Sequence, residues 1–464
     1  MNQRHDVVVL GAGSAGYAAA LRASQLGLDV ALVESDKLGG TCLHRGCIPT
    51  KAWLHAAEVA DLAREGSSMG VATSFSGVDA GALQAWSQGI IDRLHKGLTG
   101  LVEGASGVTV VRGHGTLVSD REGLGVRIAD EVVRGRNVVV ATGSQPRTLG
   151  LPIDGKRVLT SDDALRLTEL PGTAVVVGGG VIGVEIASAW RSLGVEVTIV
   201  EALDRLIPTE EPDLSKGLQR AFRKRGIQTR FGATVAGIDT TEADATIRLA
   251  DGSALAADVV LVAVGREPRT AGLGLAEAGV TLERGHLRVN DRLMTSVRGV
   301  FGVGDVVAGL QLAHRGFAHG MVVAEVIAHQ MGRLDRAPTL PRDRDLPRVT
   351  YSNPEVASVG LTTAAAERLG TVLKQDYNLA GNGRSLIRGA SGFVRVLRLE
   401  NGPIVGVHMI GQGVSEMIGE AQLAAGWEAL PEDVASLLHA HPTQGEALGE
   451  ACLALAGRPL HSHA

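Results

Sequence analysis

Two cysteines near the amino terminus, Cys42 and Cys47, are the residues of this 464-residue chain best suited to redox chemistry. They lie five positions apart, a spacing that can close a small disulfide ring. Pro49 favours a helix that begins near Cys47, and a helix N-terminus stabilises a thiolate and lowers its pKa. Two inert core cysteines and a metal site are the alternatives. Zinc needs four ligands, however, and this stretch adds only His44, so we expect no metal. Cys452 lies alone near the far end and is expected to be structural.

A histidine and a carboxylate near the carboxyl terminus, His441 and Glu446, form a second group with chemical potential. A carboxylate five residues on can hold an imidazole as an oriented base. Thiol–disulfide exchange needs such a base, because the incoming thiol must lose its proton before it attacks. An ordinary surface histidine is the alternative for His441, and nothing beyond that is expected of His439.

The elements that must position these residues begin with a segment that occurs twice. Residues 7–16 read VVVLGAGSAG and residues 174–183 read AVVVGGGVIG, and each copy predicts a strand, a GxGxxG turn, a helix and a second strand that ends in an acid. In a dinucleotide-binding unit the first glycine permits the turn, the second lets the backbone approach a pyrophosphate, and the third packs helix against strand. The residues concerned are Gly11, Gly13, Gly16 and Glu34 in the first copy and Gly178, Gly180, Gly183 and Glu201 in the second.

The two acids indicate which nucleotides are bound. Glu34 and Glu201 can each accept hydrogen bonds from a ribose diol. A 2′-phosphate beside Glu201 would place like charges together, and residues 202–204 offer no arginine, so NAD is expected rather than NADP. Apolar strands at 138–144, 260–266 and 300–305 also end in small residues and glycine. Asp305, at the tip of the last one, can bind a ligand hydroxyl or instead cap the next helix.

Composition excludes several other classes of protein. The net charge is −5, and without a Lys/Arg tract this argues against nucleic acid as a main partner. No apolar run approaches the ~20 residues of a membrane-spanning helix. The start of the chain lacks the pattern of a secretory signal, so we expect a cytoplasmic protein. Its length predicts about three domains.

These motifs, in this order, resemble the flavoprotein disulfide reductases, most closely the dihydrolipoyl dehydrogenases among them. The resemblance covers nearly the whole chain, through GAGSAGY, GGTCLHRGCIPTK, GGGVIGVE, VAVGREP, GVGDVVAGLQLAH, YSNPEVASVG and HAHPTQGE. It implies an α/β fold with two Rossmann-like dinucleotide-binding domains, for FAD and NAD, and a C-terminal α+β dimerisation domain. The implied boundaries are 1–150 for the FAD domain, 151–270 for the NAD domain, 271–343 for a central domain that completes the FAD site, and 344–464 for the interface domain.

The resemblance also implies a role for each functional residue. Cys42 would be the thiol that attacks substrate, and Cys47 the thiolate in charge-transfer contact with the flavin. His441, oriented by Glu446, would take the proton from dihydrolipoamide, and it would come from the other subunit of a homodimer. Further cofactor contacts are implied for Thr41, for Lys51 against the flavin ring and paired with Glu185, for Gly115, Thr142, Gly143, Asp305 and Ala313, and on the NAD side for Val235 and Gly265.

The activity implied is the FAD-dependent oxidation of dihydrolipoyl groups with reduction of NAD⁺, in a 2-oxo acid dehydrogenase or glycine cleavage complex. An acyltransferase core and other lipoyl-bearing proteins would then be partners. An NADPH-dependent reductase of a small disulfide such as glutathione or mycothione is the alternative, and Glu201 argues against it. Mercuric reductase is disfavoured because its additional C-terminal cysteine pair is missing. A scaffold without catalysis would not need to retain Cys42, Cys47, His441 and Glu446.

Overall fold

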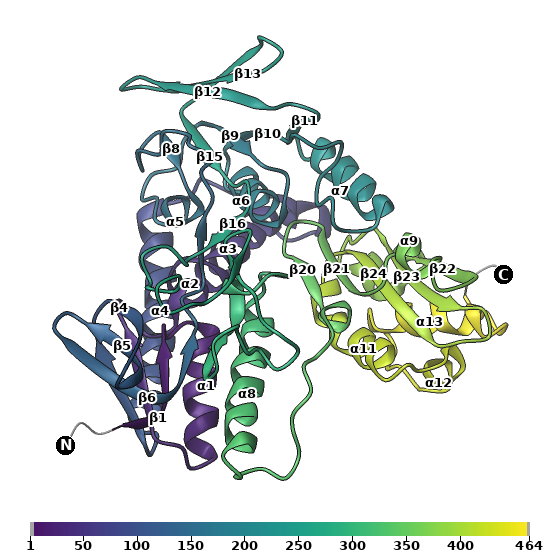
Figure 1. Ribbon diagram of the computed structural model, residues 1–464. Coiled ribbons are helices and arrows are strands. Elements are labelled where there is room, and N and C mark those ends of the chain that lie inside the picture. The colour runs from purple at the N-terminus through teal and green to yellow at the C-terminus, as the bar shows by residue number, and fades with distance from the viewer. Residues whose placement is uncertain (1–3, 462–464) are drawn as a thin grey trace. The chain divides into compact units, whose positions relative to one another are not determined.

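The computed structural model describes residues 4–461, which form two units, each assembled from separate stretches of the chain (Figure 1). The first unit comprises the residues up to Thr50 together with Gln84–Arg147 and Arg266–Asp343. The second comprises Lys51–Leu83, Thr148–Gly265 and the residues from Arg344 onward.

The first unit is built on a seven-stranded sheet in the order β3–β2–β1–β6–β5–β4, with β19 also paired to β6. The pairs β1–β2, β2–β3, β1–β6 and β6–β19 are parallel, whereas β4–β5 and β5–β6 are antiparallel. The strands are β1 (His5–Leu10), β2 (Val30–Glu34), β3 (Val108–Arg112), β4 (Gly115–Asp120), β5 (Gly123–Ile128), β6 (Glu131–Val140) and β19 (Val300–Gly302). Residues 7–10 are buried, as expected where helices cover a parallel sheet.

Two helices of this unit, α1 (Ser14–Gln25) and α8 (Ala313–Gln330), lie side by side (Figure 1). A Cβ on Gly320 of α8 would lie 2.3 Å from the Ala15 oxygen of α1, so glycine allows the two backbones to approach closely. The remaining elements of the unit are α2 (Gly40–Arg45), β7 (Ser144–Pro146) paired with β16 (Arg266–Pro268), the hairpin of β17 (Leu282–Glu283) and β18 (His286–Leu287), and η2 (Gly304–Val306). Two further helices, α3 (Cys47–Glu65) and α4 (Ala80–Glu103), contain residues of both units.

The second unit contains a five-stranded parallel sheet in the order β11–β10–β9–β15–β8, next to an antiparallel meander of β12, β13 and β14. The parallel strands are β8 (Val158–Leu159), β9 (Thr173–Val177), β10 (Glu196–Val200), β11 (Gln228–Arg230) and β15 (Val259–Val262). The meander strands are β12 (Val235–Thr240), β13 (Ala245–Leu249) and β14 (Ala254–Ala257). The helices of this part are α5 (Ser161–Ala164), α6 (Val181–Ser192) and α7 (Pro212–Lys224).

The C-terminal part of the same unit is a five-stranded antiparallel sheet in the order β20–β21–β24–β23–β22 with helices packed on it. Its strands are β20 (Arg348–Thr350), β21 (Glu355–Gly360), β22 (Val372–Asn378), β23 (Phe393–Leu399) and β24 (Ile404–Gly411). Its helices are α9 (Thr363–Ala366), α10 (Gly383–Ile387), α11 (Val414–Gly426), α12 (Pro431–Ala435) and α13 (Glu446–Leu455). The predicted combination of two nucleotide-binding sheets and a C-terminal α+β part is confirmed.

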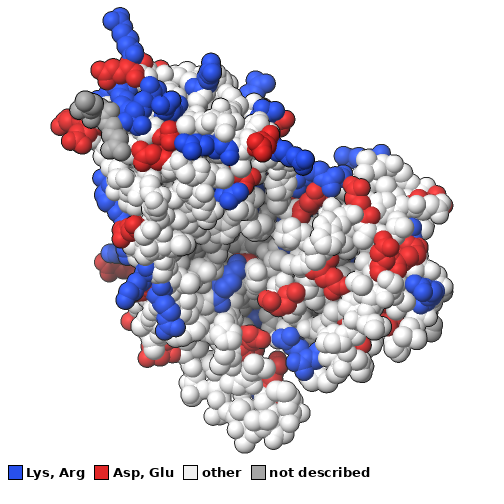
Figure 2. Space-filling model, turned by 90° about the horizontal axis from the view of Figure 1, so that it is seen from below, with Lys and Arg blue, Asp and Glu red and all other residues white. Residues whose placement is uncertain are grey.

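The surface carries mixed charge. On the face that Figure 2 shows, Lys and Arg side chains are interspersed with Asp and Glu and with uncharged residues. Across residues 4–461, none of the helices combines the length and the apolar character that crossing a bilayer requires.

Candidate active site

The first glycine-rich turn joins β1 to α1, and each of its glycines meets a different constraint. Gly11 has a φ of +100°, and a Cβ there would lie 2.6 Å from the carbonyl oxygen of Ala141. A Cβ on Gly16 would lie 1.8 Å from the Gly11 oxygen. Gly13 is the N-cap of α1. A Cβ on Gly13 would lie 3.9 Å from Gly40 Cα, an ordinary contact distance. Internal packing therefore requires glycine at two positions and leaves space at the third.

The second turn, between β9 and α6, repeats this pattern. Gly178 has a φ of +111°, with the Ala263 oxygen 2.3 Å from its ideal Cβ. A Cβ on Gly183 would lie 2.0 Å from the Gly178 oxygen, whereas none of the described atoms lies within 4 Å of a Cβ on Gly180, the N-cap of α6. Both turns thus leave room beside a helix N-terminus, where free N–H groups bind phosphate.

The two acids, Glu34 and Glu201, accept hydrogen bonds from backbone N–H groups of these turns. Glu34 Oε2 accepts a hydrogen bond from the Ala12 N–H at 2.7 Å. Glu201, which is buried, accepts hydrogen bonds from the N–H groups of Gly179 at 2.6 Å and Leu203 at 2.7 Å. Sequence reasoning did not anticipate these backbone contacts. Each carboxylate retains lone pairs for a ribose, and that contact stays a prediction.

Asp305 lies within η2 and takes part in a polar chain with two residues that sequence reasoning missed. Ser144 Oγ donates to Asp305 Oδ2 at 2.5 Å, and Arg266 Nε donates to Ser144 Oγ at 2.8 Å. The N-cap of α8 is Leu312, so capping that helix is not the role of Asp305. Both residues could have been found from motifs that follow a strand. Ser144 ends the motif ATGS after β6, and Arg266 lies in the motif VGRE after β15.

The other predicted glycines differ in their surroundings. A Cβ on Gly115, at the start of β4, would lie 2.5 Å from Val126 Cγ1, so packing alone accounts for that glycine. Gly143 has a φ of +72° and Gly265 a φ of +105°, and no described atom lies within 4 Å of a Cβ at either position. These two glycines therefore border open space at the ends of strands.

Four further predicted contact residues lie in a loop, in a short helix or at the start of an element. Thr142 Oγ1 donates to the Arg269 oxygen at 2.7 Å. Thr41 lies in α2, Ala313 is the first residue of α8, and Val235 is the first residue of β12. Their cofactor contacts remain predictions.

The two cysteines lie on consecutive helices. Cys42 is in α2 and Cys47 is the first residue of α3, and both are half-buried. Burial, and then the negative charge of these two cysteines, raise the pKa of Tyr17, so α1 brings a phenol close to the pair. By contrast, Cys452 is fully buried, and burial raises the pKa of its thiol to about 12, as expected of a structural residue.

Two histidines, His44 and His95, contact the same backbone carbonyl. Nε2 of His44 lies 2.8 Å, and Nδ1 of His95 lies 3.1 Å, from the same Leu38 oxygen. Because a carbonyl oxygen only accepts, each of these nitrogens carries a proton. Sequence reasoning did not find His95, which comes from α4, 57 positions away from Leu38.

Within the second unit, the predicted Lys51–Glu185 and His441–Glu446 pairs are both formed. Lys51 Nζ lies 3.1 and 2.9 Å from the two carboxylate oxygens of Glu185. Nδ1 of His441 lies 2.8 Å from Glu446 Oε1, and the Thr443 N–H donates to Oε2 at 2.7 Å. Burial alone would raise the pKa of Glu446, but the hydrogen bonds from Thr443 and His441 outweigh it and lower that pKa below 4.5. The ionised carboxylate thus fixes a proton on Nδ1 and leaves Nε2 available as a base.

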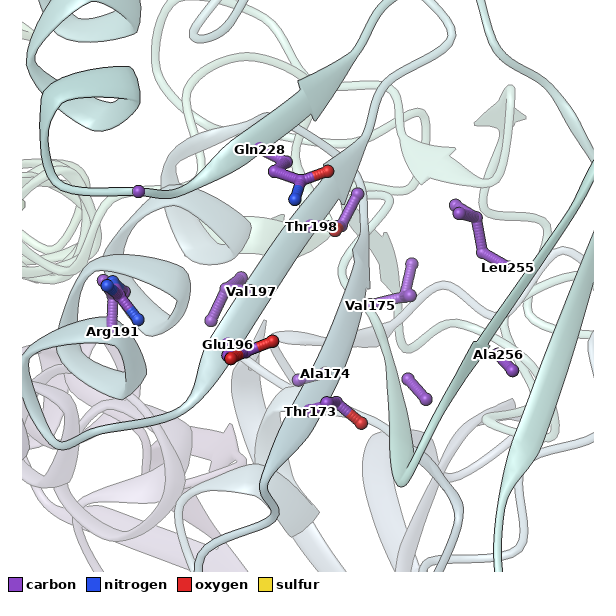
Figure 3. A pocket seen from close by; sticks show the side chains of 12 residues that line it. Thr173, Ala174, Val175, Arg191, Glu196, Val197, Thr198, Gln228, Leu255 and Ala256 are labelled. Atoms are coloured by element: carbon purple, nitrogen blue, oxygen red, sulfur yellow. The ribbon is translucent and has the colours of Figure 1, made fainter.

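The second unit also contains a pocket of about 370 Å³, which is separate from the glycine turn at Gly178 (Figure 3). Thr173 and Glu196, which line it, are the first residues of β9 and β10, whereas the Gly178 turn follows the last residue of β9. The pocket is therefore at the opposite end of these strands from the predicted nucleotide site. Within residues 4–461, no group of three or more His, Cys, Asp or Glu side chains is arranged to hold a metal ion.

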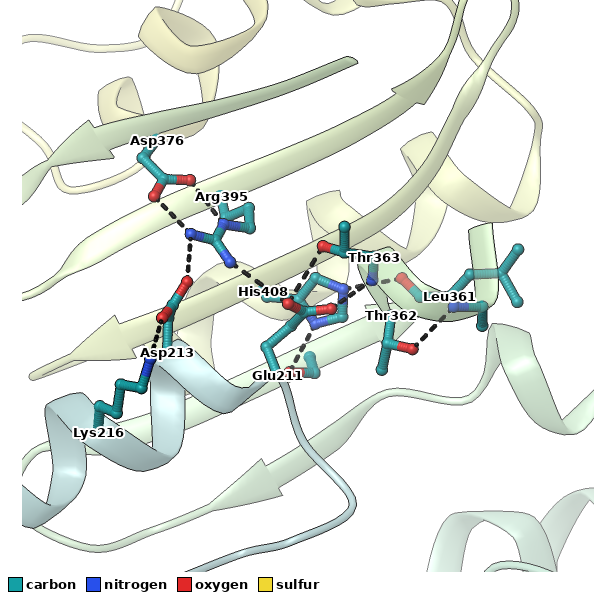
Figure 4. A network of polar contacts seen from close by, with 11 residues as sticks. Glu211, Asp213, Lys216, Leu361, Thr362, Thr363, Asp376, Arg395 and His408 are labelled. Carbon is teal, nitrogen blue, oxygen red and sulfur yellow. Dashed lines mark hydrogen bonds and ion pairs between the residues drawn. The ribbon is translucent and has the colours of Figure 1, made fainter. Parts of the chain in front are cut away.

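A buried ionic network ties α7 to the C-terminal sheet (Figure 4). The guanidinium of Arg395 on β23 contacts Asp376 twice at 2.7 Å, Asp213 at 3.0 Å and Glu211 at 3.3 Å. Arg395 and Glu211 are almost fully buried, and the hydrogen bond from Arg395 lowers the pKa of Asp213. This network is structural, and no sequence motif indicated it.

Comparison with known proteins identifies the family. The family model described as pyridine nucleotide-disulphide oxidoreductase matches residues 5–320, and the model of the dimerisation domain of the same family matches residues 346–452. The chain belongs to this family.

Individual relatives match nearly the whole length of the chain. The dihydrolipoyl dehydrogenase of Bacillus subtilis (strain 168) is 40% identical over 482 aligned residues, which cover 99% of this chain and 100% of that protein. The leghemoglobin reductase of Vigna unguiculata is 39% identical, with 100% of this chain and 89% of that protein covered. The crystal structure of LpdA from Mycobacterium tuberculosis matches with a TM-score of 0.89 and 26% identity, covering 97% of this chain and 99% of that one.

These findings establish the general nature of the protein. It is a flavoprotein disulfide oxidoreductase with Rossmann-like FAD and pyridine-nucleotide domains and a dimerisation domain. Members of the family bind FAD and a pyridine nucleotide.

Proposed function

We propose that this oxidoreductase converts dihydrolipoyl groups to lipoyl groups and reduces NAD⁺ to NADH. Full-length similarity to a protein named dihydrolipoyl dehydrogenase supports the substrate. The observation that carries the mechanism is the His441–Glu446 pair, in which the carboxylate contacts Nδ1 and Nε2 is the nitrogen positioned to accept a proton from a thiol. Glu201 supports NAD, because its buried carboxylate would repel a 2′-phosphate.

The glycine turns fit the two nucleotides. Beside Gly13 and Gly180 there is space for a pyrophosphate at a helix N-terminus, and the acids Glu34 and Glu201 follow at the ends of the next strands. We assign the FAD domain to 1–150, completed by 271–343, the NAD domain to 151–270 and the interface domain to 344–464. Further cofactor contacts are assigned to Thr41, Lys51, Gly115, Thr142, Gly143, Asp305, Ala313, Glu185, Val235 and Gly265.

The thiol chemistry needs Cys42, Cys47 and His441. Nε2 of His441 takes the proton of one dihydrolipoyl thiol, and the resulting sulfur attacks Cys42 Sγ of the Cys42–Cys47 disulfide. The disulfide breaks, its electron pair remains on Cys47, and a mixed disulfide forms on Cys42. The second dihydrolipoyl thiol then attacks the substrate sulfur of the mixed disulfide, and its proton passes to Cys42 as Cys42 leaves. The substrate departs as a closed disulfide, and the protein holds a Cys42 thiol, a Cys47 thiolate and a proton on His441. Bound FAD supplies the two-electron carrier between that dithiol and NAD⁺.

We also propose a homodimer in which His441 of one subunit serves the cysteines of the other. The dimerisation domain supports association, and several large apolar side chains are exposed in its last third. These exposed residues are Leu423, Trp427, Leu437 and Leu438. Lipoyl-bearing proteins, including the acyltransferase core of a 2-oxo acid dehydrogenase complex, are the proposed partners.

The first test compares NAD⁺ with NADP⁺ as acceptors for dihydrolipoamide, using purified protein with its flavin bound. We expect rapid NADH formation and no turnover with NADP⁺. Oxidation of NADPH by glutathione or mycothione disulfide, without dihydrolipoamide oxidation, would instead make the chain a reductase of small disulfides.

Two variants test the assigned residues. Cys42→Ser is expected to abolish turnover yet retain flavin, whereas His441→Gln should lower turnover by about 10²- to 10⁴-fold, the usual contribution of a general base. Native turnover in either variant would remove that residue from the mechanism.

A further inference from the structure

The carboxylate of Glu185 has a second partner besides Lys51, and that partner comes from the C-terminal part of the chain. Glu185 is 4% exposed, so its charge needs compensation from the protein. Lys51 supplies an ammonium, and the backbone N–H of Tyr351 donates to Glu185 Oε1 at 2.9 Å. Tyr351 follows directly after β20, 166 positions from Glu185 in the sequence.

The side chain of Tyr351 contacts the ammonium of Lys51, the other partner of Glu185. Lys51 Nζ lies 4.4 Å from the centroid of the Tyr351 ring, within the range of a cation–π interaction. The ammonium thus contacts both the Glu185 carboxylate and an aromatic face. A lysine has a flexible four-carbon stem and is disordered unless its ammonium is held. Ring and carboxylate thus both favour the observed position of the Lys51 ammonium.

The backbone around Tyr351 is held independently of its ring. The Asn353 N–H donates to Ser188 Oγ at 2.9 Å, and Ser188 lies three residues after Glu185 on α6. Arg225 also donates to the Asn353 oxygen at 2.8 Å. A substitution at Tyr351 therefore removes the ring from Lys51 and leaves the contacts of the backbone with α6 in place.

We propose that Tyr351 is a positioning residue whose ring fixes the ammonium of Lys51 beside Glu185. This rests on the proposed function only in assigning Lys51 to the flavin and Glu185 to the nicotinamide. The ring contacts the Lys51 ammonium, so we expect it to affect the rate at saturating substrate rather than substrate binding. The dimerisation domain thereby contributes to the nucleotide side of its own chain as well as supplying His441.

The experiment compares Tyr351→Leu, which removes the ring, with Tyr351→Phe, which keeps it, in the flavin-bound protein. The first readout is acetylation of Lys51 by N-hydroxysuccinimidyl acetate, followed by mass spectrometry, with the exposed Lys374 as internal standard. We expect acetylation about fivefold faster in Tyr351→Leu, the factor that corresponds to a modest cation–π contact, and native rates in Tyr351→Phe. This readout does not depend on the identity of the substrate.

The second readout separates positioning from a general loss of structure. Tyr351→Leu should lower kcat by a similar factor of about five with KM for both substrates unchanged, and Tyr351→Phe should restore kcat. Native acetylation and kcat in Tyr351→Leu, or equal defects in both variants, would overturn the proposal. If Tyr351→Leu unfolds, Tyr351→Met replaces it under the same criteria. Failure of the native chain to oxidise dihydrolipoamide would reject the proposed function, and the acetylation result would still decide this inference.

Discussion

Replacing Glu446 by glutamine, a side chain of nearly the same shape, should change which ring nitrogen of His441 carries the proton. The two oxygens of Glu446 have separate tasks, because Oε1 accepts from Nδ1 of His441 and Oε2 accepts from the Thr443 N–H. A glutamine has one oxygen. The Thr443 N–H can only donate, so it takes that oxygen, and the amide NH₂ turns toward Nδ1. The imidazole then favours accepting at Nδ1 with its proton on Nε2, so the tautomer that can act as a base becomes less favourable by the free energy of that contact.

The size of the effect follows from the exposure of the pair. A hydrogen bond to a charged group contributes roughly 1.5–3 kcal/mol. The side chain of His441 is 80% exposed, so water competes for it and the lower end of that range applies. At about 1.4 kcal/mol for each factor of ten, we expect kcat for dihydrolipoamide oxidation to fall roughly 10- to 30-fold.

The lowered pKa of Glu446 places the acid limit of this contact below pH 4.5, with the contact present above that limit and lost as the pH falls through it.

A matched control lies one turn further along α13. Glu450 also accepts from a histidine and a backbone N–H, since Oε1 lies 2.8 Å from Nδ1 of His461 and Oε2 accepts from the His461 N–H at 3.0 Å. Steady-state formation of NADH should be near native in Glu450→Gln and reduced in Glu446→Gln. Native kcat in Glu446→Gln, or an equal loss in Glu450→Gln, would refute the tautomer argument.

Three other outcomes follow from the packing and charges. Arg395→Met leaves buried carboxylate charge uncompensated, and we expect about 3 kcal/mol of destabilisation in urea unfolding; an unchanged midpoint would contradict this. The hydrogen bond from Glu420 raises the pKa of His439, so that pair stabilises the fold below pH 6.5 and loses its effect as the pH rises through the raised pKa. The difference in melting temperature between the native chain and Glu420→Gln should therefore shrink from pH 6 to pH 9. Gly180→Ala should fold and raise KM for NAD⁺, whereas Gly183→Ala should lose soluble protein, since only its Cβ collides with the chain; the reverse order would invalidate this distinction.

The glycine turns could be predicted because their requirements are local. Gly11 and Gly16 lie five residues apart, and the collision of a Cβ on Gly16 with the Gly11 oxygen is a property of any strand–turn–helix with this spacing. The Lys51–Glu185 pair came from the resemblance alone. For Gly115 the resemblance implied a cofactor contact, and the structure adds packing against Val126 as a sufficient reason for glycine.

The partners that sequence reasoning missed are distant in the chain and carry no periodic signal. Tyr351 meets Glu185 through a backbone N–H, a group that every residue except proline possesses. Ser144 meets Asp305 across 161 positions, and a serine at the end of a strand has many possible uses. Only the tertiary structure selects these residues, because their function depends on what each of them faces.

The position of Glu201 links nucleotide choice to the folding of the turn. Its carboxylate is buried and accepts two backbone hydrogen bonds, from Gly179 and Leu203, so it is a structural part of the loop that would receive the adenosine ribose. Replacing Glu201 by a small uncharged residue to admit a 2′-phosphate would also leave two N–H groups without an acceptor, at a cost of about 1–3 kcal/mol for each one that stays buried. A change toward NADP would therefore require new cations nearby together with another acceptor for Gly179. For that reason the preference for NAD that we propose is built into the backbone of the turn.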